Sequence, residues 1–121
     1  MNALTLLYVA LGGALGSVTR AVAGHVIPAG RLPWATLLVN VTGSLAIGWL
    51  IACYAAFGEA NVRAYSFWVV GVCGGFTTFS SFSLQTFELL QKGQWGTAAA
   101  YVALSVGLCL VATWLGWKLG Q

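Results

Sequence analysis

The sequence predicts an all-α membrane protein with four transmembrane helices, the third of which is broken in its middle. Of its 121 residues, 60% are hydrophobic and only 6% are charged, a balance that would leave a small soluble domain with almost no charged surface. A helix that crosses a lipid bilayer needs roughly 20 mostly apolar residues. We therefore expect one membrane domain, residues 1–121, with spans at about 3–23, 34–57, 67–91 and 97–119.

The first predicted span contains small residues at helical spacing, Gly12, Gly13 and Gly16. Small side chains let two helices approach closely in lipid, where packing holds the spans together. Arg20 lies near the end of this span. Its side chain either reaches the lipid headgroups or attracts anions toward a vestibule.

The second predicted span contains an amide, Asn40, within an apolar run. An amide inside a span costs free energy unless it is hydrogen-bonded. Asn40 therefore either joins two helices or offers its NH₂ donors to a passing ligand. Gly43 and Ser44, one turn later, keep this face of the helix open.

The third predicted span is weakened by Gly74 and Gly75, and five hydroxyls follow at Thr77, Thr78, Ser80, Ser81 and Ser83. Irregular backbone at membrane depth must be buried in protein or line a polar cavity. The break therefore predicts an ion or substrate site.

The aromatic residues Phe76, Phe79 and Phe82 recur every three residues beside these hydroxyls. This spacing predicts that they share one face of the second half-helix, either as pathway residues or as a packing stripe. In the fourth span, Tyr101, Ser105 and Cys109 recur every four residues. They predict a mildly polar stripe that faces the hydroxyls of the third span.

The net charge of +3 comes from charges scattered singly along the chain, with no basic run that could bind nucleic acid. The basic residues divide almost evenly between the two sides of the membrane, with Arg63 and Lys118 on one side and Arg20, Arg31 and Lys92 on the other. Such a chain has almost no preferred orientation. We expect an antiparallel, dual-topology homodimer in the lipid bilayer.

Three segments, read in order, resemble the Fluc (CrcB) fluoride-channel family. They are Gly12-Gly13-x-x-Gly16-x-x-x-Arg20, Asn40-x-x-Gly43 and Gly71-x-x-Gly74-Gly75-x-Thr77-Thr78-Phe79-Ser80-Ser81-Phe82. The resemblance implies a fluoride-selective channel that passively exports fluoride across the bacterial inner membrane. It also implies a dual-topology dimer with two antiparallel pores and one central sodium ion.

The same resemblance implies roles for individual residues. The backbone carbonyls of Gly74 and Thr77 would bind sodium, and Arg20 would lie at a vestibule. The fluoride pathway would contain Asn40, Phe79, Phe82, Ser80, Ser81, Tyr101 and Ser105. Aromatic ring edges carry partial positive charge, and several weak sites allow an ion to leave as well as to enter. Cys109 departs from the pattern, because a thiol donates a weaker hydrogen bond than a hydroxyl.

Two other functions fit four spans. A small proton-coupled exporter needs a carboxylate within the membrane, but Glu59 lies in a predicted loop and Glu88 near the end of a span. A membrane assembly subunit without transport would use the Phe and hydroxyl residues only for packing. No nucleophile–base pair or metal-ligand motif indicates an enzyme.

Overall fold

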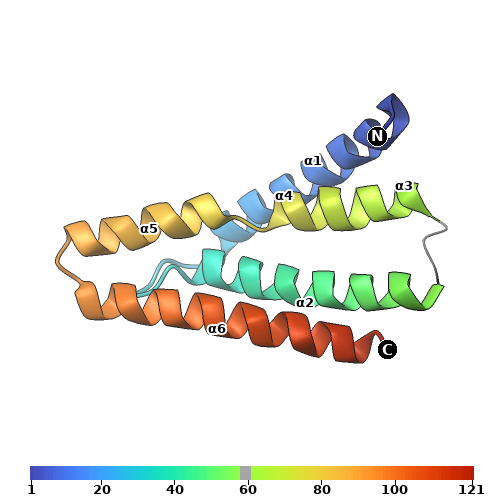
Figure 1. Ribbon diagram of the computed structural model, residues 1–121. Coiled ribbons are helices and arrows are strands. Elements are labelled where there is room, and N and C mark those ends of the chain that lie inside the picture. Colours follow the sequence, from blue (N-terminus) through green and yellow to red (C-terminus); the bar gives the residue numbers. More distant parts are fainter. Residues whose placement is uncertain (58–60) are drawn as a thin grey trace.

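The computed structural model describes residues 1–57 and 61–121, and all the regular structure in these ranges is helical. Glu59, one of the two carboxylates, lies outside the described residues. Within them, four helices are long and apolar enough to cross a membrane: Ala3–Val26, Trp34–Ala55, Val62–Gln91 and Trp95–Leu119. Figure 1 shows that three of these lengths run side by side while the first crosses behind them. The predicted all-helical fold with four apolar spans is confirmed.

The first two helices have clear sequence reasons for their ends. Helix α1 (Ala3–Val26) is capped by Asn2, whose side chain accepts a hydrogen bond from the Thr5 N–H at 2.9 Å. It ends where Ile27 becomes extended just before Pro28, because the residue preceding a proline disfavours helical backbone. Helix α2 (Trp34–Phe57) begins directly after Pro33.

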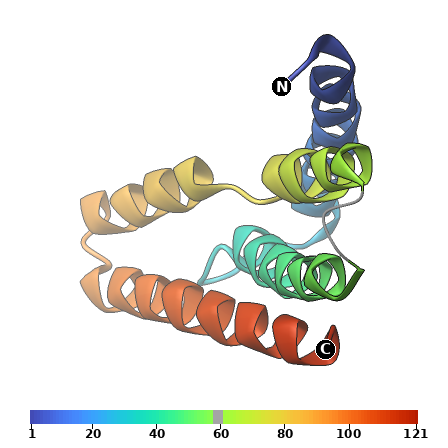
Figure 2. The ribbon, with the colours of Figure 1, turned by 45° about the vertical axis from the view of Figure 1, so that its right-hand side comes forward.

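The third span consists of two helical lengths joined by extended backbone. The first length comprises α3 (Val62–Tyr65), the π-helix η1 (Ser66–Cys73) and α4 (Gly74–Phe76). Thr77 and Thr78 are then extended, with ψ of 157° and 115°. Helix α5 (Phe79–Gln91) follows, and Figure 2 shows the extended connection between the two lengths.

Local side-chain bonding fixes this interruption at Thr77 and Thr78. The Thr78 hydroxyl accepts from the Ser81 N–H at 3.1 Å and so caps the start of α5. The Thr77 hydroxyl donates to the Cys73 carbonyl at 2.8 Å and closes the preceding turn. The expectation that Phe76 shares a helical face with Phe79 and Phe82 is wrong, because Phe76 lies on α4, before the interruption.

The fourth span is α6 (Trp95–Leu119), which follows α5 after a tight turn. Gly93 in this turn has a φ of +73°, a conformation that residues with a Cβ rarely adopt. As a result α5 and α6 lie as antiparallel neighbours (Figure 1).

Two pairs of helices approach so closely that glycine is required at the contact. A Cβ at Gly12 in α1 would overlap the Phe67 carbonyl oxygen of η1, and a Cβ at Gly116 in α6 would overlap the Leu45 carbonyl oxygen of α2. Figure 2 shows these pairs, with α1 against the first half of the third span and α2 against α6. Close backbone packing of this kind is how spans associate in lipid.

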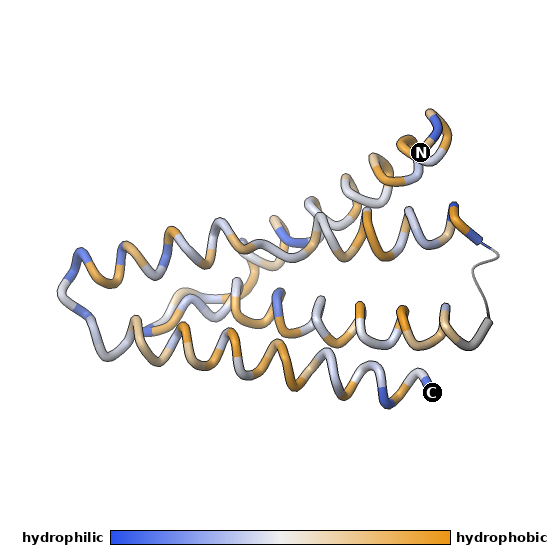
Figure 3. The backbone as a smooth tube through the Cα atoms, viewed as in Figure 1, coloured by the Kyte–Doolittle hydropathy of each residue, from blue (hydrophilic) through white to orange (hydrophobic). Residues whose placement is uncertain are grey.

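A cluster of buried hydrophobic residues lies at one end of the bundle. Leu37, Leu89, Ala98 and Tyr101 form it, and the Tyr101 side chain has 0% exposure. Many large apolar side chains elsewhere remain exposed, and Figure 3 shows that hydrophilic positions are sparse along the helices. This surface suits lipid and neighbouring helices, and the chain is a multi-pass membrane protein.

Candidate functional site

A groove of about 670 Å³ lies beside the interruption in the third span. It is lined from three spans, because α2, the interrupted third span and α6 all contribute side chains. Of the residues predicted for the site, those that line the groove are Asn40, Gly74, Thr77, Phe79, Phe82 and Ser105. The interruption thus places polar and aromatic groups that are far apart in the sequence in one groove.

Asn40 binds the backbone of the interruption from the neighbouring helix. The Thr78 N–H donates to Asn40 Oδ1 at 2.8 Å, and Asn40 Nδ2 donates to the Thr78 carbonyl at 3.0 Å. Both backbone polar groups of Thr78 are therefore satisfied by one amide side chain. The second N–H of the Asn40 NH₂ group is not used in this pair, and Asn40 lines the groove.

Arg20 also bonds to the interrupted span. Its Nε donates to the Gly75 carbonyl at 3.2 Å, and the Ser17 hydroxyl donates to the same oxygen at 3.4 Å. In an uninterrupted helix this carbonyl would accept from residue 79. The guanidinium also places positive charge at the negative end of the first half of the span. Sequence reasoning considered headgroups or anions for Arg20 and missed this carbonyl as its partner.

The interruption leaves further carbonyls without their usual helical donors, among them those of Gly74 and Thr77. The Gly74 carbonyl would normally accept from the Thr78 N–H, which instead donates to Asn40. The Thr77 carbonyl would normally accept from the Ser81 N–H, which instead donates to the Thr78 hydroxyl. Both residues line the groove. The two backbone oxygens predicted to bind a cation are therefore among those whose helical partners are diverted.

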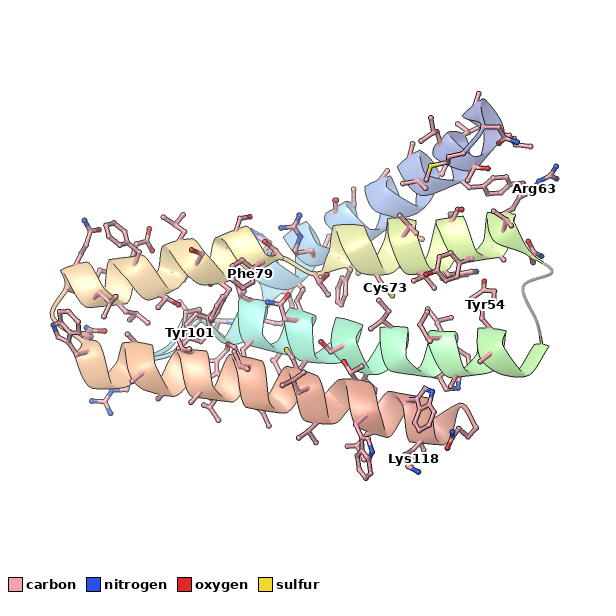
Figure 4. The ribbon with its side chains drawn as sticks, in the orientation of Figure 1. Tyr54, Arg63, Cys73, Phe79, Tyr101 and Lys118 are labelled. Carbon is pink, nitrogen blue, oxygen red and sulfur yellow. The ribbon has the colours of Figure 1, made fainter. Side chains whose placement is uncertain are left out.

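The aromatic side chains form a connected row from the groove into the core. The ring centroids of Phe79 and Phe82 are 5.4 Å apart at 58°, and those of Phe82 and Tyr101 are 5.2 Å apart at 56°. In tilted pairs the positively polarised edge of one ring packs toward the face of the other. Phe79 is 78% exposed, whereas Tyr101 is fully buried; Figure 4 shows Phe79 at the start of α5 and Tyr101 on α6.

The polar residues beyond the groove fall into two groups. Tyr101 donates its O–H to Gln85 Oε1 at 2.8 Å, and Ser105, one turn further along α6, has a buried hydroxyl without a hydrogen-bond partner. Ser80 and Ser81 instead surround the Thr78 hydroxyl at the N-terminus of α5, with Thr78 donating to Ser81 Oγ at 3.1 Å. Neither serine lines the groove.

Gln85 is a site residue that sequence reasoning missed. It follows Phe82 by one helical turn, so the spacing that singled out the phenylalanines also places Gln85 on their face. A polar side chain at that spacing could have been included in the predicted pathway.

The chemistry of the groove suits binding and passage of small ions. Its lining among the described residues consists of backbone, hydroxyl, amide, thiol and apolar groups, without a charged side chain. Within residues 1–57 and 61–121 there is no group of three His, Cys, Asp or Glu residues that could hold a metal ion. A cation at this position would therefore have backbone and hydroxyl oxygens as its ligands, as hard cations prefer.

The chain is a small polytopic membrane protein with four apolar spans, three of which line a groove beside a helix interruption. The family model described as CrcB-like protein, Camphor Resistance (CrcB), matches residues 7–117, and the chain belongs to this family. The resemblance predicted from the sequence is thereby confirmed.

Curated relatives cover nearly the whole chain. The protein named fluoride-specific ion channel FluC of Paramagnetospirillum magneticum is 50% identical over 118 residues, which cover 93% of this chain and 92% of the relative. The protein of the same name from Opitutus terrae is 54% identical over 115 residues, covering 91% of this chain and 87% of the relative. That of Rhodospirillum rubrum is 48% identical over 119 residues, with 93% and 92% covered.

Proposed function

We propose that this chain is a fluoride-selective channel that passively exports fluoride across the bacterial inner membrane. Its membership of the CrcB-like family and the names of its relatives support this function. The observation that carries it is the groove, where neutral donors and aromatic edges from three spans meet at the helix interruption. A conducting site must replace the hydration of an ion without holding the ion tightly.

The groove replaces anion hydration with several weak donors. An unpaired anion in a low-dielectric interior costs tens of kcal/mol in idealised Born estimates. Asn40 has a spare N–H, the Ser105 hydroxyl has no partner, and Phe79 and Phe82 supply ring edges. None of these groups carries a full positive charge, so the anion can leave again.

Beyond Phe82, the anion reaches the Tyr101 hydroxyl, whose O–H already donates a hydrogen bond within the protein. The Tyr101 O–H donates to Gln85 Oε1, so the phenol offers an anion only lone pairs while this bond lasts. For the ion to pass, the Tyr101 O–H turns from the Gln85 carbonyl to the anion, and the Gln85 NH₂ group supplies a further donor. One hydrogen bond is exchanged for another, and this exchange keeps the free-energy barrier to passage of the anion low.

An antiparallel homodimer of dual topology would complete the pathway. Phe79 lines the groove but is 78% exposed, so one wall of the groove is open in a single chain. A second protein copy over this open wall would keep lipid away from the polar groups in the groove, such as the Asn40 amide. The nearly even distribution of basic residues between the two sides supports insertion of the two copies in opposite orientations.

A sodium ion at the dimer interface would be held by the carbonyls of Gly74 and Thr77. Both carbonyls have lost their usual helical donors, and hard oxygen ligands suit sodium. Two carbonyls from one chain leave most of the coordination shell of a hard cation unfilled, and those of the second copy would double the number of protein ligands. The bound cation would join the two interrupted spans across the two-fold axis.

Efflux from liposomes containing the purified protein tests the function directly. Fluoride-loaded and chloride-loaded vesicles are diluted into impermeant salt, and each anion is followed with its own electrode. We expect rapid fluoride loss with chloride retained, and protein-free vesicles provide the baseline. Retention of both anions by vesicles that contain folded protein would refute the channel.

A further inference from the structure

A second cavity, of about 300 Å³, lies at the end of the bundle where α5 turns into α6. Its walls are the loop between α1 and α2, the start of α2 and the C-terminal half of α5. Unlike the apolar surface around the spans, this cavity is lined by Arg31, Lys92, Glu88, Gln85 and Thr36. The prolines of the loop, Pro28 and Pro33, hold this wall in place because their φ angles are fixed.

The cavity has a net positive charge. Arg31 and Lys92 contribute two cationic groups and Glu88 one carboxylate. Helix termini do not change this sign, because the negative ends of α1 and α5 meet the positive ends of α2 and α6 at the same end of the bundle. Side chains therefore decide the local field, and that field favours anions.

The inner wall of this cavity adjoins the row of rings that leads from the groove. Gln85 lines the cavity, accepts the Tyr101 hydroxyl at 2.8 Å, and Tyr101 in turn packs against Phe82 of the groove. Because the Tyr101 hydroxyl is bonded to Oε1 of the Gln85 amide, the NH₂ group of that amide points away from the phenol. The NH₂ donors of Gln85 are not used in this bond, and Gln85 lines the cavity.

We propose that this cavity is an electropositive antechamber that collects small inorganic anions from water and delivers them to the Gln85 amide. Arg31 and Lys92 raise the local anion concentration, and Glu88 limits it so that the anion is not trapped. The inference rests on the proposed channel function for what happens after Gln85. The electrostatic part, however, is a property of the cavity alone.

Thiol modification measures that field without any ion conduction. Ala29 lines the cavity and is exposed, so Ala29→Cys places a reporter there in a chain whose Cys53, Cys73 and Cys109 are replaced by alanine. The protein is held in nanodiscs of neutral phosphatidylcholine at low ionic strength. The rates of modification by anionic and cationic methanethiosulfonates of similar size are then compared.

We expect the anionic reagent to react several-fold faster than the cationic one after correction for their rates with a free thiol. Arg31→Gln with Lys92→Gln should remove the preference, Glu88→Gln should increase it, and about 0.5 M salt should suppress it by screening. Arg63→Gln is the matched control, because Arg63 is an exposed cation at the opposite end of the bundle (Figure 4). An unchanged rate ratio after neutralising Arg31 and Lys92 would overturn the antechamber.

Fluoride efflux provides a second measurement that does not need the cysteine-free chain. At about 10 mM salt, neutralising Arg31 and Lys92 should lower efflux roughly two- to fivefold, and the difference should vanish at high salt. Equal efflux at low salt would contradict the proposal. In a further outcome, the unmodified chain conducts no fluoride while the preference for the anionic methanethiosulfonate still depends on Arg31 and Lys92. That result would refute the channel function and support the anion-collecting cavity.

Discussion

Asn40 and Thr78 exchange two hydrogen bonds, N–H to Oδ1 at 2.8 Å and Nδ2 to carbonyl at 3.0 Å, between α2 and the interrupted span. Backbone groups freed at membrane depth need partners, because lipid supplies none. One amide supplies both a donor and an acceptor, which a hydroxyl could do only in poorer geometry. The interruption is thus a feature of two helices together rather than of the third span alone.

Substitution of Asn40 tests this pairing. Asn40→Ala leaves the Thr78 N–H unpaired and removes a second donor from the Thr78 carbonyl, which still accepts the first bond of α5. An unpaired buried polar group costs about 1–3 kcal/mol. We expect a lower unfolding temperature in detergent together with lost fluoride efflux. Asn40→Asp keeps the acceptor for the Thr78 N–H but loses the donor, so it should unfold at a temperature between those of the parent and the alanine variant. An alanine variant as stable as the parent would contradict the pairing.

Arg20 offers a test that separates capping from long-range attraction of anions. Its bond to the Gly75 carbonyl involves a charged donor, and such bonds contribute about 1.5–3 kcal/mol. We expect Arg20→Ala to lower the unfolding temperature and to reduce fluoride efflux by a factor that is the same at low and high salt. Arg20→Gln, a neutral donor, should recover part of the stability. If Arg20→Gln only weakens efflux at low salt and leaves stability unchanged, anion attraction is the better explanation.

The sequence was sufficient to predict most of the fold because lipid restricts the possible structures. Apolar length alone identified four spans, and Gly74 and Gly75 with the hydroxyls after them pointed to the third span. The position of the interruption at Thr77 and Thr78 depends on bonds to Asn40 in another helix. A pattern within one segment cannot contain that information.

The candidate site was predictable to a similar extent. Asn40, Phe79, Phe82 and Ser105 stood out as polar or aromatic groups inside spans, and they meet in one groove. Gln85 was missed because its partner, the Tyr101 hydroxyl, belongs to another helix. The proximity of Arg20 to Gly75 depends on how α1 crosses the third span, which no spacing within α1 encodes.

Replacement of Phe79 or Phe82 by isoleucine should separate a pathway role from a packing role. Phe79 is 78% exposed in the single chain, so Phe79→Ile should change the stability of the chain little. Isoleucine has no positively polarised ring edge, and we expect fluoride efflux to fall tenfold or more, about 1.4 kcal/mol in barrier. Phe82→Ile should reduce both efflux and stability, because Phe82 also packs on Tyr101. Parent-like efflux in both variants would exclude the aromatic pathway.

Gly12→Ala tests the close approach of α1 to the third span. The added Cβ would overlap the Phe67 carbonyl oxygen, and overpacking of this kind costs about 1–3 kcal/mol. Gly24→Ala in the same helix is the matched control, since its Cβ meets nothing within 4 Å. In a helix interior, alanine is more favourable than glycine by about 1 kcal/mol of folding free energy. We therefore expect opposite shifts in unfolding temperature for the two variants, and equal shifts would contradict the packing.

Removal of sodium tests the proposed central cation. A cation bound at 100 times its dissociation constant stabilises the assembly by about 2.7 kcal/mol. We expect prolonged dialysis into N-methylglucamine to lower the unfolding temperature of the dimer and fluoride efflux, and added sodium to restore both. Because the proposed ligands are the carbonyls of Gly74 and Thr77, Thr77→Ala should retain the sodium response while losing only the hydroxyl bond to Cys73. The sodium site is refuted if neither the unfolding temperature nor fluoride efflux depends on sodium and equilibrium dialysis detects no bound cation. The two carbonyls would then have another partner across the interface.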